Sequence, residues 1–206
     1  MKIGLLNYGL GNIGSVLSAL HFLKKEPVII DSATDIKKVD TIIVSGVGNF
    51  GYAMPLLAKG GHIEELETFV FQRGKPYLGI CLGMQLMADF SEESGTKVKG
   101  LNWIPGQVKQ LLPANDKIPH MGWETLKTNN SNLFRNGLNG PFYFMHSFHF
   151  EPKDQAVISS WANHGQMEFV ASVQKDNIFG VQFHPEKSQG DGIRLINNFL
   201  EIAREV

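Results

Sequence analysis

The chain has 206 residues, of which 43% are hydrophobic, 10% aromatic and 19% charged. This length and composition favour a single globular domain over residues 1–206 and exclude an intrinsically disordered chain. Nineteen Lys and Arg residues nearly balance twenty Asp and Glu residues, and no basic run is present. We therefore expect no nucleic acid among the partners of this protein.

The sequence contains a single cysteine, Cys81, so an intramolecular disulfide is excluded. A reducing, cytoplasmic compartment fits this cysteine usage. No stretch reaches the ~18–20 apolar residues of a membrane span, and residues 1–20 are interrupted by asparagines and glycines. We expect neither a signal peptide nor a membrane anchor.

The first half of the chain alternates short apolar runs with helical patterns, which is typical of βαβ units. Parallel strands are predicted at Ile3–Leu6, Val28–Ile30, 41–44 and 76–80. The spacing of apolar residues predicts helices over 13–23, 63–74 and 82–90, with Asn12 as the N-cap of the first. Gly74 suits the left-handed end of the second helix.

From residue 100 onward, short alternating segments and frequent turns predict strands over 107–111, 142–150, 156–161, 169–173 and 178–183. The chain closes with an amphipathic helix over residues 193–202. Together these elements predict an α/β fold with an open, mostly parallel central sheet, flanking helices and a β-rich second half.

Cys81 lies between two glycines, in Gly79-Ile80-Cys81-Leu82-Gly83, where a predicted strand meets a helical pattern. This is the pattern of a nucleophile elbow, with a thiol in place of the serine hydroxyl. Glycines leave room at such a sharp turn, and a helix N-terminus favours the thiolate, which is the attacking form. The alternative is that Cys81 is a small buried apolar residue.

His184-Pro185-Glu186 follows the predicted strand over 178–183. Because proline keeps the chain extended, His184 and Glu186 project to the same side, and the carboxylate is placed to orient the imidazole. A cysteine, a histidine and a carboxylate form a catalytic triad in its general form. Taken alone, a segment of this kind is more often a surface loop.

The segment Ser45-Gly46-Val47-Gly48-Asn49-Phe50-Gly51 follows the predicted strand over 41–44. Its glycines allow backbone N–H groups to turn toward a ligand, as an oxyanion hole requires, although a flexible connector fits equally well. In open α/β sheets, ligands bind beyond the carboxyl ends of the strands, where these segments all fall. We therefore predict a catalytic site formed by Cys81, His184 and Glu186.

Two competing interpretations concern cofactors. Gly9-Leu10-Gly11-Asn12-Ile13-Gly14 matches a dinucleotide-binding pattern, and Asp31 ends the next strand where a ribose-binding carboxylate would lie. A dinucleotide-binding domain, however, leaves the elbow and the His-Pro-Glu segment unexplained. In a strand over 142–150, His146 and His149 face opposite sides, so we predict no metal site and no cofactor.

The Cys81 and His184 segments, together with Gly46-Val47-Gly48, resemble class I glutamine amidotransferases. Further motifs resemble the glutaminase subunits of imidazole glycerol phosphate synthases within that family, namely Asn7-Tyr8-Gly9-Leu10-Gly11-Asn12, Pro119-His120-Met121-Gly122-Trp123, Phe144-Met145-His146-Ser147 and Gln182-Phe183-His184-Pro185-Glu186-Lys187-Ser188. This resemblance implies hydrolysis of L-glutamine and delivery of ammonia to a (β/α)₈-barrel cyclase subunit, in a heterodimer of histidine biosynthesis. It also implies that the glycine-rich N-terminal motif lies near the docking face and binds no dinucleotide.

The resemblance further implies roles for individual residues. The oxyanion would be held by N–H groups of Leu82 and of Val47 or Gly48, and glutamine by Gln85, His146 and Ser147. Interface or gate residues would be Asn12, Trp123, Tyr143 and Lys187. From the sequence alone, Trp123 and Tyr143 are more often packing residues, and Gln85 is an ordinary polar residue of a helix.

Two alternatives share the predicted fold. Related glutaminase subunits supply ammonia for amidino groups on surface sugars, and departures such as Ser45, where proline is usual, leave this acceptor open. A stand-alone hydrolase of γ-glutamyl or peptide bonds would use the same triad without a partner.

Overall fold

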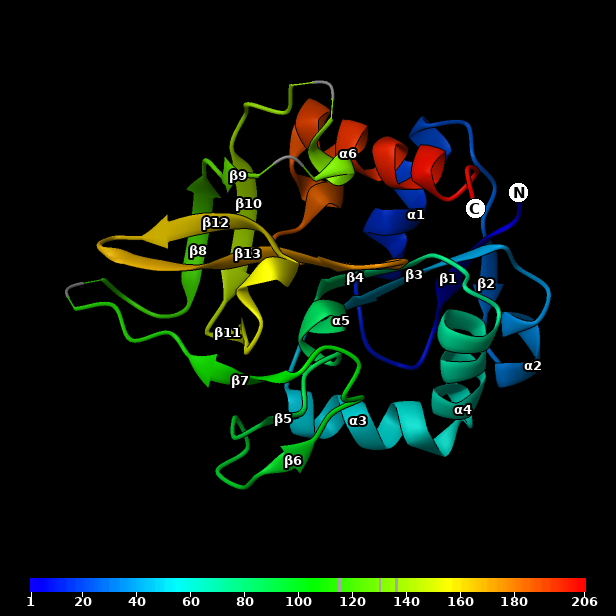
Figure 1. Cartoon of the computed structure of the whole chain (residues 1–206), viewed down its shortest axis with the longest axis horizontal. Helices are drawn as coiled ribbons and strands as arrows, with labels where there is room; N and C mark the ends of the chain where they lie inside the picture. The colour runs from blue at the N-terminus through cyan, green and yellow to red at the C-terminus, as the bar shows by residue number, and fades with distance from the viewer. Residues whose placement is uncertain (115, 130, 136) are drawn as a thin grey trace.

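The structure is a computed structural model that describes residues 1–114, 116–129, 131–135 and 137–206. Its centre is an eight-stranded mixed sheet in the order β2-β1-β3-β4-β14-β13-β12-β9 (Figure 1). Five neighbouring strands run parallel, namely β2 (Val28–Ile30), β1 (Ile3–Leu6), β3 (Thr41–Gly46), β4 (Tyr77–Cys81) and β14 (Ile178–Val181). Three antiparallel strands extend the sheet, namely β13 (Met167–Lys175), β12 (Ile158–His164) and β9 (Lys127–Thr128). The predicted α/β fold is confirmed.

Helices cover both faces of the sheet, so its central strands are apolar on both sides. One face carries α1 (Ile13–Phe22) and α6 (Gln189–Ile202), and the other carries α3 (Phe50–Lys59), α4 (His62–Glu67) and α5 (Leu82–Gln85) (Figure 1). A buried apolar cluster fills each interface, one including Leu20 and Phe199 and the other Leu57 and Met84. The short α2 (Ala33–Ile36) connects β2 to β3.

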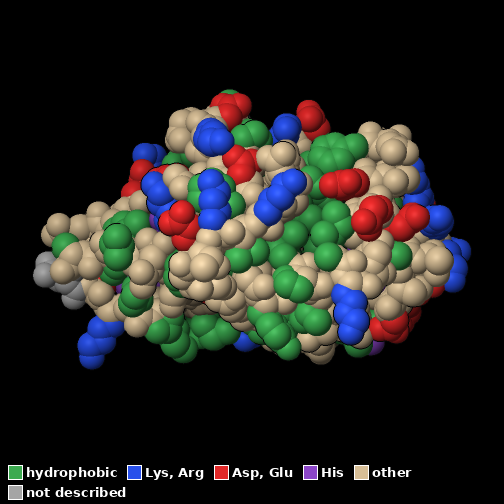
Figure 2. All heavy atoms as spheres, turned by 90° about the horizontal axis from the view of Figure 1, so that it is seen from below, with side chains coloured by type: hydrophobic (Ala, Val, Ile, Leu, Met, Phe, Trp, Pro, Cys, Tyr) green, Lys and Arg blue, Asp and Glu red, His purple; other side chains and the backbone are tan. Residues whose placement is uncertain are grey.

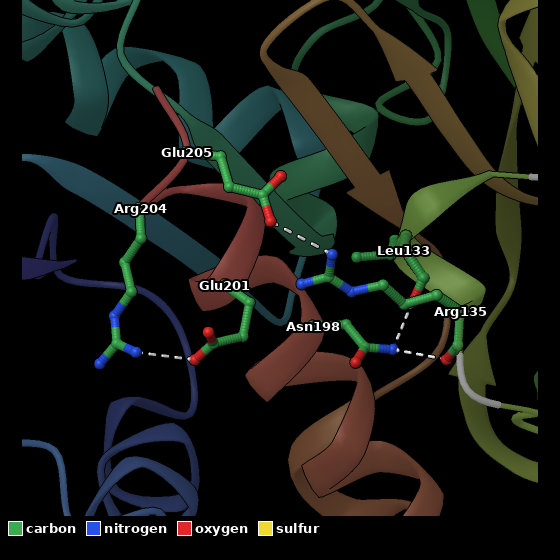
Figure 3. Close-up of polar contacts among 6 residues, drawn as sticks. All are labelled: Leu133, Arg135, Asn198, Glu201, Arg204 and Glu205. Carbon is green, nitrogen blue, oxygen red and sulfur yellow. Dashed lines mark hydrogen bonds and ion pairs between the residues drawn. The ribbon is translucent and has the colours of Figure 1, made fainter.

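Helix α6 is fixed to the segment over residues 131–135 by a buried amide. The Asn198 side chain donates hydrogen bonds to the carbonyls of Leu133 (3.1 Å) and Arg135 (2.9 Å), beside the short helix η2 (Asn132–Phe134) (Figure 3). The ion pairs Arg135–Glu205 and Arg204–Glu201 in the same view are exposed, so each stabilises the fold little. The buried bonds of Asn198 therefore make the more specific contact.

Two smaller sheets complete the β-rich half. Strand β10 (Phe142–His146) pairs with β8 (His120–Glu124), and a four-stranded sheet consists of β11 (Phe148–Pro152), β7 (Gly106–Gln110), β5 (Phe90–Ser91) and β6 (Val98–Lys99). The prediction of one strand over 142–150 is therefore wrong. The chain changes sheets at Ser147, whose carbonyl accepts a hydrogen bond from the Leu111 N–H, so His146 and His149 lie on different strands.

Several predicted helices differ from the structure. The helix predicted over 82–90 stops after α5, because the N–H groups of Leu101 and Trp103 bond to the carbonyls of Leu86 and Met87. The helix predicted over 63–74 is α4 followed by the π-helical η1 (Thr68–Gln72), and Gly74 does adopt a left-handed φ of 62°. Asn12 occupies the N-cap of α1, but its side chain makes no capping hydrogen bond.

Charges of both signs are interspersed on the face seen from below, on which Lys and Arg side chains lie among Asp, Glu and apolar groups (Figure 2). Within the described residues, no helix is long and apolar enough to cross a membrane.

Candidate active site

Cys81 ends β4 in a strained conformation, with φ 53° and ψ −110°, directly before α5. The turn needs its glycines, since a Cβ on Gly79 would lie 2.4 Å from the carbonyl oxygen of Gly83 and one on Gly83 would lie 2.0 Å from that of Val44. Such strain persists only when the surrounding structure enforces it, and it is common at functional sites. The predicted nucleophile elbow is therefore the conformation that the chain adopts.

His184 and Glu186 lie at the carboxyl end of β14, the strand next to β4. The Nδ1 atom of His184 is 2.8 Å from Oε1 of Glu186, and both side chains are almost fully buried. The segment is not extended, contrary to the prediction, because Pro185 begins the short helix η4 (Pro185–Lys187). The helical turn, and not an extended chain, brings the carboxylate back to the imidazole. This bond makes Nδ1 the protonated nitrogen and leaves Nε2 for the sulfur.

The Cys81 thiol and the His184 ring lie within interaction range. Burial would lower the pKa of His184, but the Cys81 sulfur and then the Glu186 carboxylate raise it to about 10. Nε2 of His184 has no hydrogen bond of normal geometry to another group in the described chain. The structure thus brings the three predicted triad residues together, with the imidazole favoured in its charged form.

A cavity of about 200 Å³ opens beside the sulfur. It is lined by Val47, Gly48, Cys81, Leu82, Gln85, Glu93, Pro119, Met145, His146, Ser147 and Phe148. All the residues predicted for the oxyanion hole and for glutamine binding are therefore in its wall. Gly46 is the register partner of Cys81, which places the segment after β3 against the elbow, and Gly48 has a φ of 124° that favours glycine.

Gln85 is held in one orientation. Its Nε2 donates to the carbonyl of Phe148 (2.8 Å) and to Oε1 of Gln182 (3.0 Å), which uses both of its N–H bonds. Nε2 of Gln182 lies 3.6 Å from the Cys81 sulfur. No role was predicted for Gln182 from the sequence, although it is part of the motif that carries His184.

Glu93 is a second residue that sequence reasoning missed. It follows β5, far from every motif, and no signal in the sequence connects it with Cys81. Its Oε2 accepts a 2.6 Å hydrogen bond from the Phe50 N–H, and burial raises the pKa of its carboxyl group. Among the residues that line the cavity, it contributes the one carboxylate.

His146 belongs to a buried pair of histidines. Its Nε2 lies 3.2 Å from Nδ1 of His120, and its Nδ1 lies 2.9 Å from the carbonyl of Phe148, so Nδ1 is the donor. Burial lowers the pKa of His120 to about 4 and that of His146 to about 3. Within the described residues, no group of three or more His, Cys, Asp or Glu side chains could hold a metal ion.

The predicted interface residues form one cluster, apart from Asn12 at the start of α1. Trp123 and Tyr143 are register partners on β8 and β10 with ring centroids 5.6 Å apart, and the Lys187 ammonium lies 5.9 Å from the Tyr143 ring. Trp123 and its neighbour Met121 are 42% and 61% exposed. We call Met121, Trp123, Tyr143 and Lys187 the Trp123 cluster. Strand β10, which carries Tyr143, also supplies Met145 and His146 to the cavity wall.

Comparisons with known proteins agree with this geometry. Residues 6–203 match the sequence profile described as glutamine amidotransferase class-I. Imidazole glycerol phosphate synthase subunit HisH of Moorella thermoacetica is 41% identical over 204 residues, which cover 98% of this chain and 95% of the relative. Subunit HisH 1 of Campylobacter jejuni subsp. jejuni is 42% identical over 203 residues, which cover 97% and 100% of the two chains.

A crystal structure of a glutamine amidotransferase has the same fold. It superposes with a TM-score of 0.75 at 20% identity and covers 99% of this chain and 100% of that chain. The profile match spans almost every residue, and the two HisH relatives align over nearly their full lengths. On these grounds the chain belongs to the class I glutamine amidotransferase family.

Proposed function

We propose that this protein is the glutaminase subunit of an imidazole glycerol phosphate synthase. The proposal rests above all on the buried Cys81–His184–Glu186 array, whose Cys81 lines a small cavity. The identity of about 40% to HisH subunits over nearly the full chain supports this assignment over an amidino-sugar pathway. Residues 1–206 would act as one catalytic domain, in a cytoplasmic compartment that keeps Cys81 reduced.

The cavity suits a single amino acid. Its volume of about 200 Å³ is below the ~300–1,000 Å³ of pockets for drug-sized ligands. The Glu93 carboxylate would bind the α-ammonium group of L-glutamine. Because both N–H bonds of Gln85 are already used, Gln85 offers the substrate its carbonyl oxygen, which accepts from an ammonium or carboxamide N–H group. Ser147 and His146 would line the opposite wall.

In the first half of the reaction, the Cys81 thiolate attacks the carboxamide carbon of glutamine. The carbonyl oxygen becomes an oxyanion, which the N–H of Leu82 and one from Val47 or Gly48 would bind. His184 gives its Nε2 proton to the departing nitrogen, so ammonia leaves as the tetrahedral intermediate collapses to a thioester. Glu186 holds the imidazole in the required tautomer throughout.

In the second half, a water molecule attacks the thioester. The now neutral His184 accepts one proton from this water at Nε2, and the hydroxide adds to the thioester carbonyl. Collapse of the second tetrahedral intermediate breaks the carbon–sulfur bond, releases glutamate and restores the thiolate beside a charged imidazole. The raised pKa of His184 favours the charged form of its imidazole in this state.

Released ammonia would be protonated in bulk water near neutral pH and lose its nucleophilicity. The reaction therefore requires a partner that seals the site, and we propose a (β/α)₈-barrel cyclase subunit in a heterodimer. The Trp123 cluster, which includes Tyr143 and Lys187, would contact this partner, as would Asn12. Exposed aromatic side chains of this kind are enriched at protein interfaces.

The test is Cys81→Ala in complex with the cyclase partner. Glutamine-dependent turnover should fall to background, while turnover with added ammonium salt and binding of the partner remain unchanged. Substantial glutamine-dependent ammonia release by the variant would disprove the assigned nucleophile. Full glutaminase activity of the wild-type chain without any partner would instead favour a stand-alone hydrolase.

A further inference from the structure

Gln182 places a polar side chain in the apolar interior directly beside the nucleophile. It follows β14, its backbone N–H bonds to the carbonyl of Ala171, and the residue is fully buried. Burying an amide is unfavourable unless its polar atoms are paired. The reaction steps proposed for Cys81 and His184 do not use this side chain, and its contacts indicate what it does.

The orientation of the Gln182 amide is fixed by its neighbour. Gln85 can only donate through Nε2, so the atom of Gln182 that lies 3.0 Å away must be the acceptor Oε1. The NH₂ group of Gln182 then points to the Cys81 sulfur, 3.6 Å away. The reverse orientation would set two NH₂ groups against each other and turn an oxygen toward the sulfur.

Gln85 is itself anchored by main chain. The carbonyl of Phe148, which accepts its second N–H, also lies 2.9 Å from the donor Nδ1 of His146. Rotating the Gln85 amide would break both of its hydrogen bonds. The Phe148 carbonyl therefore fixes the orientation of the Gln85 amide, and Gln85 fixes that of Gln182. The NH₂ group of Gln182 is thereby held toward the Cys81 sulfur.

We infer that Gln182 is a further catalytic residue, whose side-chain N–H donates a hydrogen bond to the Cys81 thiolate and which Gln85 keeps in that orientation. This inference rests on the proposed function and deepens it. Besides the His184 ring, whose pKa the sulfur raises, the amide of Gln182 then adds a donor at the sulfur. A hydrogen bond to a charged group in a buried site stabilises the charged form.

The titration of the sulfur offers a direct readout, because Cys81 is the single cysteine of the chain. The titratable groups that face it are His184 with Glu186 behind it, and Tyr8, whose pKa is raised by burial and by Cys81. Glu93 and His146 lie across the cavity. Substitutions at Gln182 and Gln85 leave all of these groups unchanged.

The experiment measures the rate of alkylation of Cys81 by iodoacetamide as a function of pH, in the full-length chain. Gln182→Met keeps the length of the side chain but removes the donor. We expect the midpoint of the pH profile to move upward by about one pH unit, as loss of one charge-assisted hydrogen bond predicts. Gln85→Met should move it in the same direction but less, since Gln182 loses its orientation.

Gln174→Met is the matched control, because Gln174 lies on β13 and accepts a hydrogen bond from Ser131, away from the sulfur. Its profile should match that of the wild type. If Gln182→Met does not fold, Gln182→Leu provides the same test. An unchanged midpoint in a folded variant would overturn the inference.

The two proposals fail separately in this design, since alkylation requires neither glutamine nor a partner. A shifted midpoint supports the role of Gln182 even in a chain that hydrolyses no glutamine. If the wild-type chain hydrolyses glutamine but Gln182→Met has an unchanged midpoint, the role of Gln182 is overturned and the proposed function is not.

Discussion

Two buried histidine sites interact electrostatically, and they are driven to opposite charge states. At the end of β14, the Cys81 sulfur and the Glu186 carboxylate overcome burial and raise the pKa of His184 to about 10. On β8 and β10, burial lowers the pKa of His120 to about 4 and that of His146 to about 3. The positive charge of His184 contributes to the low pKa of His146.

The difference shows that neighbours, more than burial, decide which histidine performs acid–base chemistry. His184 has the Glu186 carboxylate on Nδ1 and the Cys81 sulfur close enough to raise its pKa, whereas His146 has a carbonyl and another neutral imidazole. In a medium of low polarity, the first arrangement stabilises a charge and the second does not. One charged imidazole is thereby fixed next to the sulfur, while the His120–His146 pair stays neutral.

The strongest test of this contrast removes the charge behind His184. Glu186→Gln keeps the size of the side chain but takes away one of the two groups that raise the pKa of the ring. We expect kcat for glutamine to fall by about 10²-fold in the complex with the cyclase, a typical contribution of positioned acid–base catalysis. The pKa of His184 should fall as well, measurable by NMR of the ring.

Glu151→Gln is the control for this variant, because Glu151 is a half-exposed carboxylate that pairs with Lys109. It should keep the wild-type kcat. A Glu186→Gln variant as inactive as Cys81→Ala would show that the carboxylate does more than orient and stabilise the imidazole. Wild-type turnover would show that Cys81 alone sets the charge of His184.

The neutral pair predicts a loss of stability in acid. A histidine with a lowered folded-state pKa binds fewer protons in the folded chain, so its contribution is present above the unfolded pKa of ~6.5 and lost as pH falls toward 4. For His120 and His146, the free energy of unfolding should fall by about 2 kcal/mol each between pH 7 and pH 5. Urea unfolding at the two pH values measures it.

His146→Gln removes one titrating group, so the drop between pH 7 and pH 5 should shrink by about the share of one histidine. His21→Gln, which changes a histidine on the exposed side of α1, should keep the full drop. Equal pH dependence in all three proteins would contradict the assignment of neutral, buried imidazoles.

How far the sequence predicts the site depends on how local the signal is. The elbow at Cys81 and the pairing of His184 with Glu186 are predicted from residues within a few positions, and the sheet-edge rule brings them together. The helical turn of the His-Pro-Glu segment is not predicted, since proline also fits an extended chain. Glu93, the amide of Gln182 and the His120–His146 pair depend on contacts between distant segments, which no spacing encodes. The change of sheet at Ser147 was missed for the same reason, since the alternation of residues 142–150 continues through it.

A single hydroxyl gives the smallest effect that still tests how His184 is held. Ser188 accepts a 2.9 Å hydrogen bond from the Tyr143 N–H and donates one of 2.6 Å to the His184 carbonyl, while the His184 N–H bonds to the Tyr143 carbonyl. These hydrogen bonds connect His184 to β10, the strand of Tyr143. Ser188→Ala should lower the free energy of unfolding by about 1–3 kcal/mol and kcat by several-fold.

The hydroxyls of Ser160 and Ser172 supply the matched control, because they form a buried 2.6 Å hydrogen bond on β12 and β13. Ser172→Ala should reduce stability by a similar amount, measured by urea unfolding, and leave kcat unchanged. If Ser188→Ala is destabilised but turns over glutamine at the wild-type rate, the hydrogen bonds of Ser188 stabilise the fold but do not position His184 for catalysis. If only Ser188→Ala loses turnover, the position of His184 depends on its hydrogen bonds with β10.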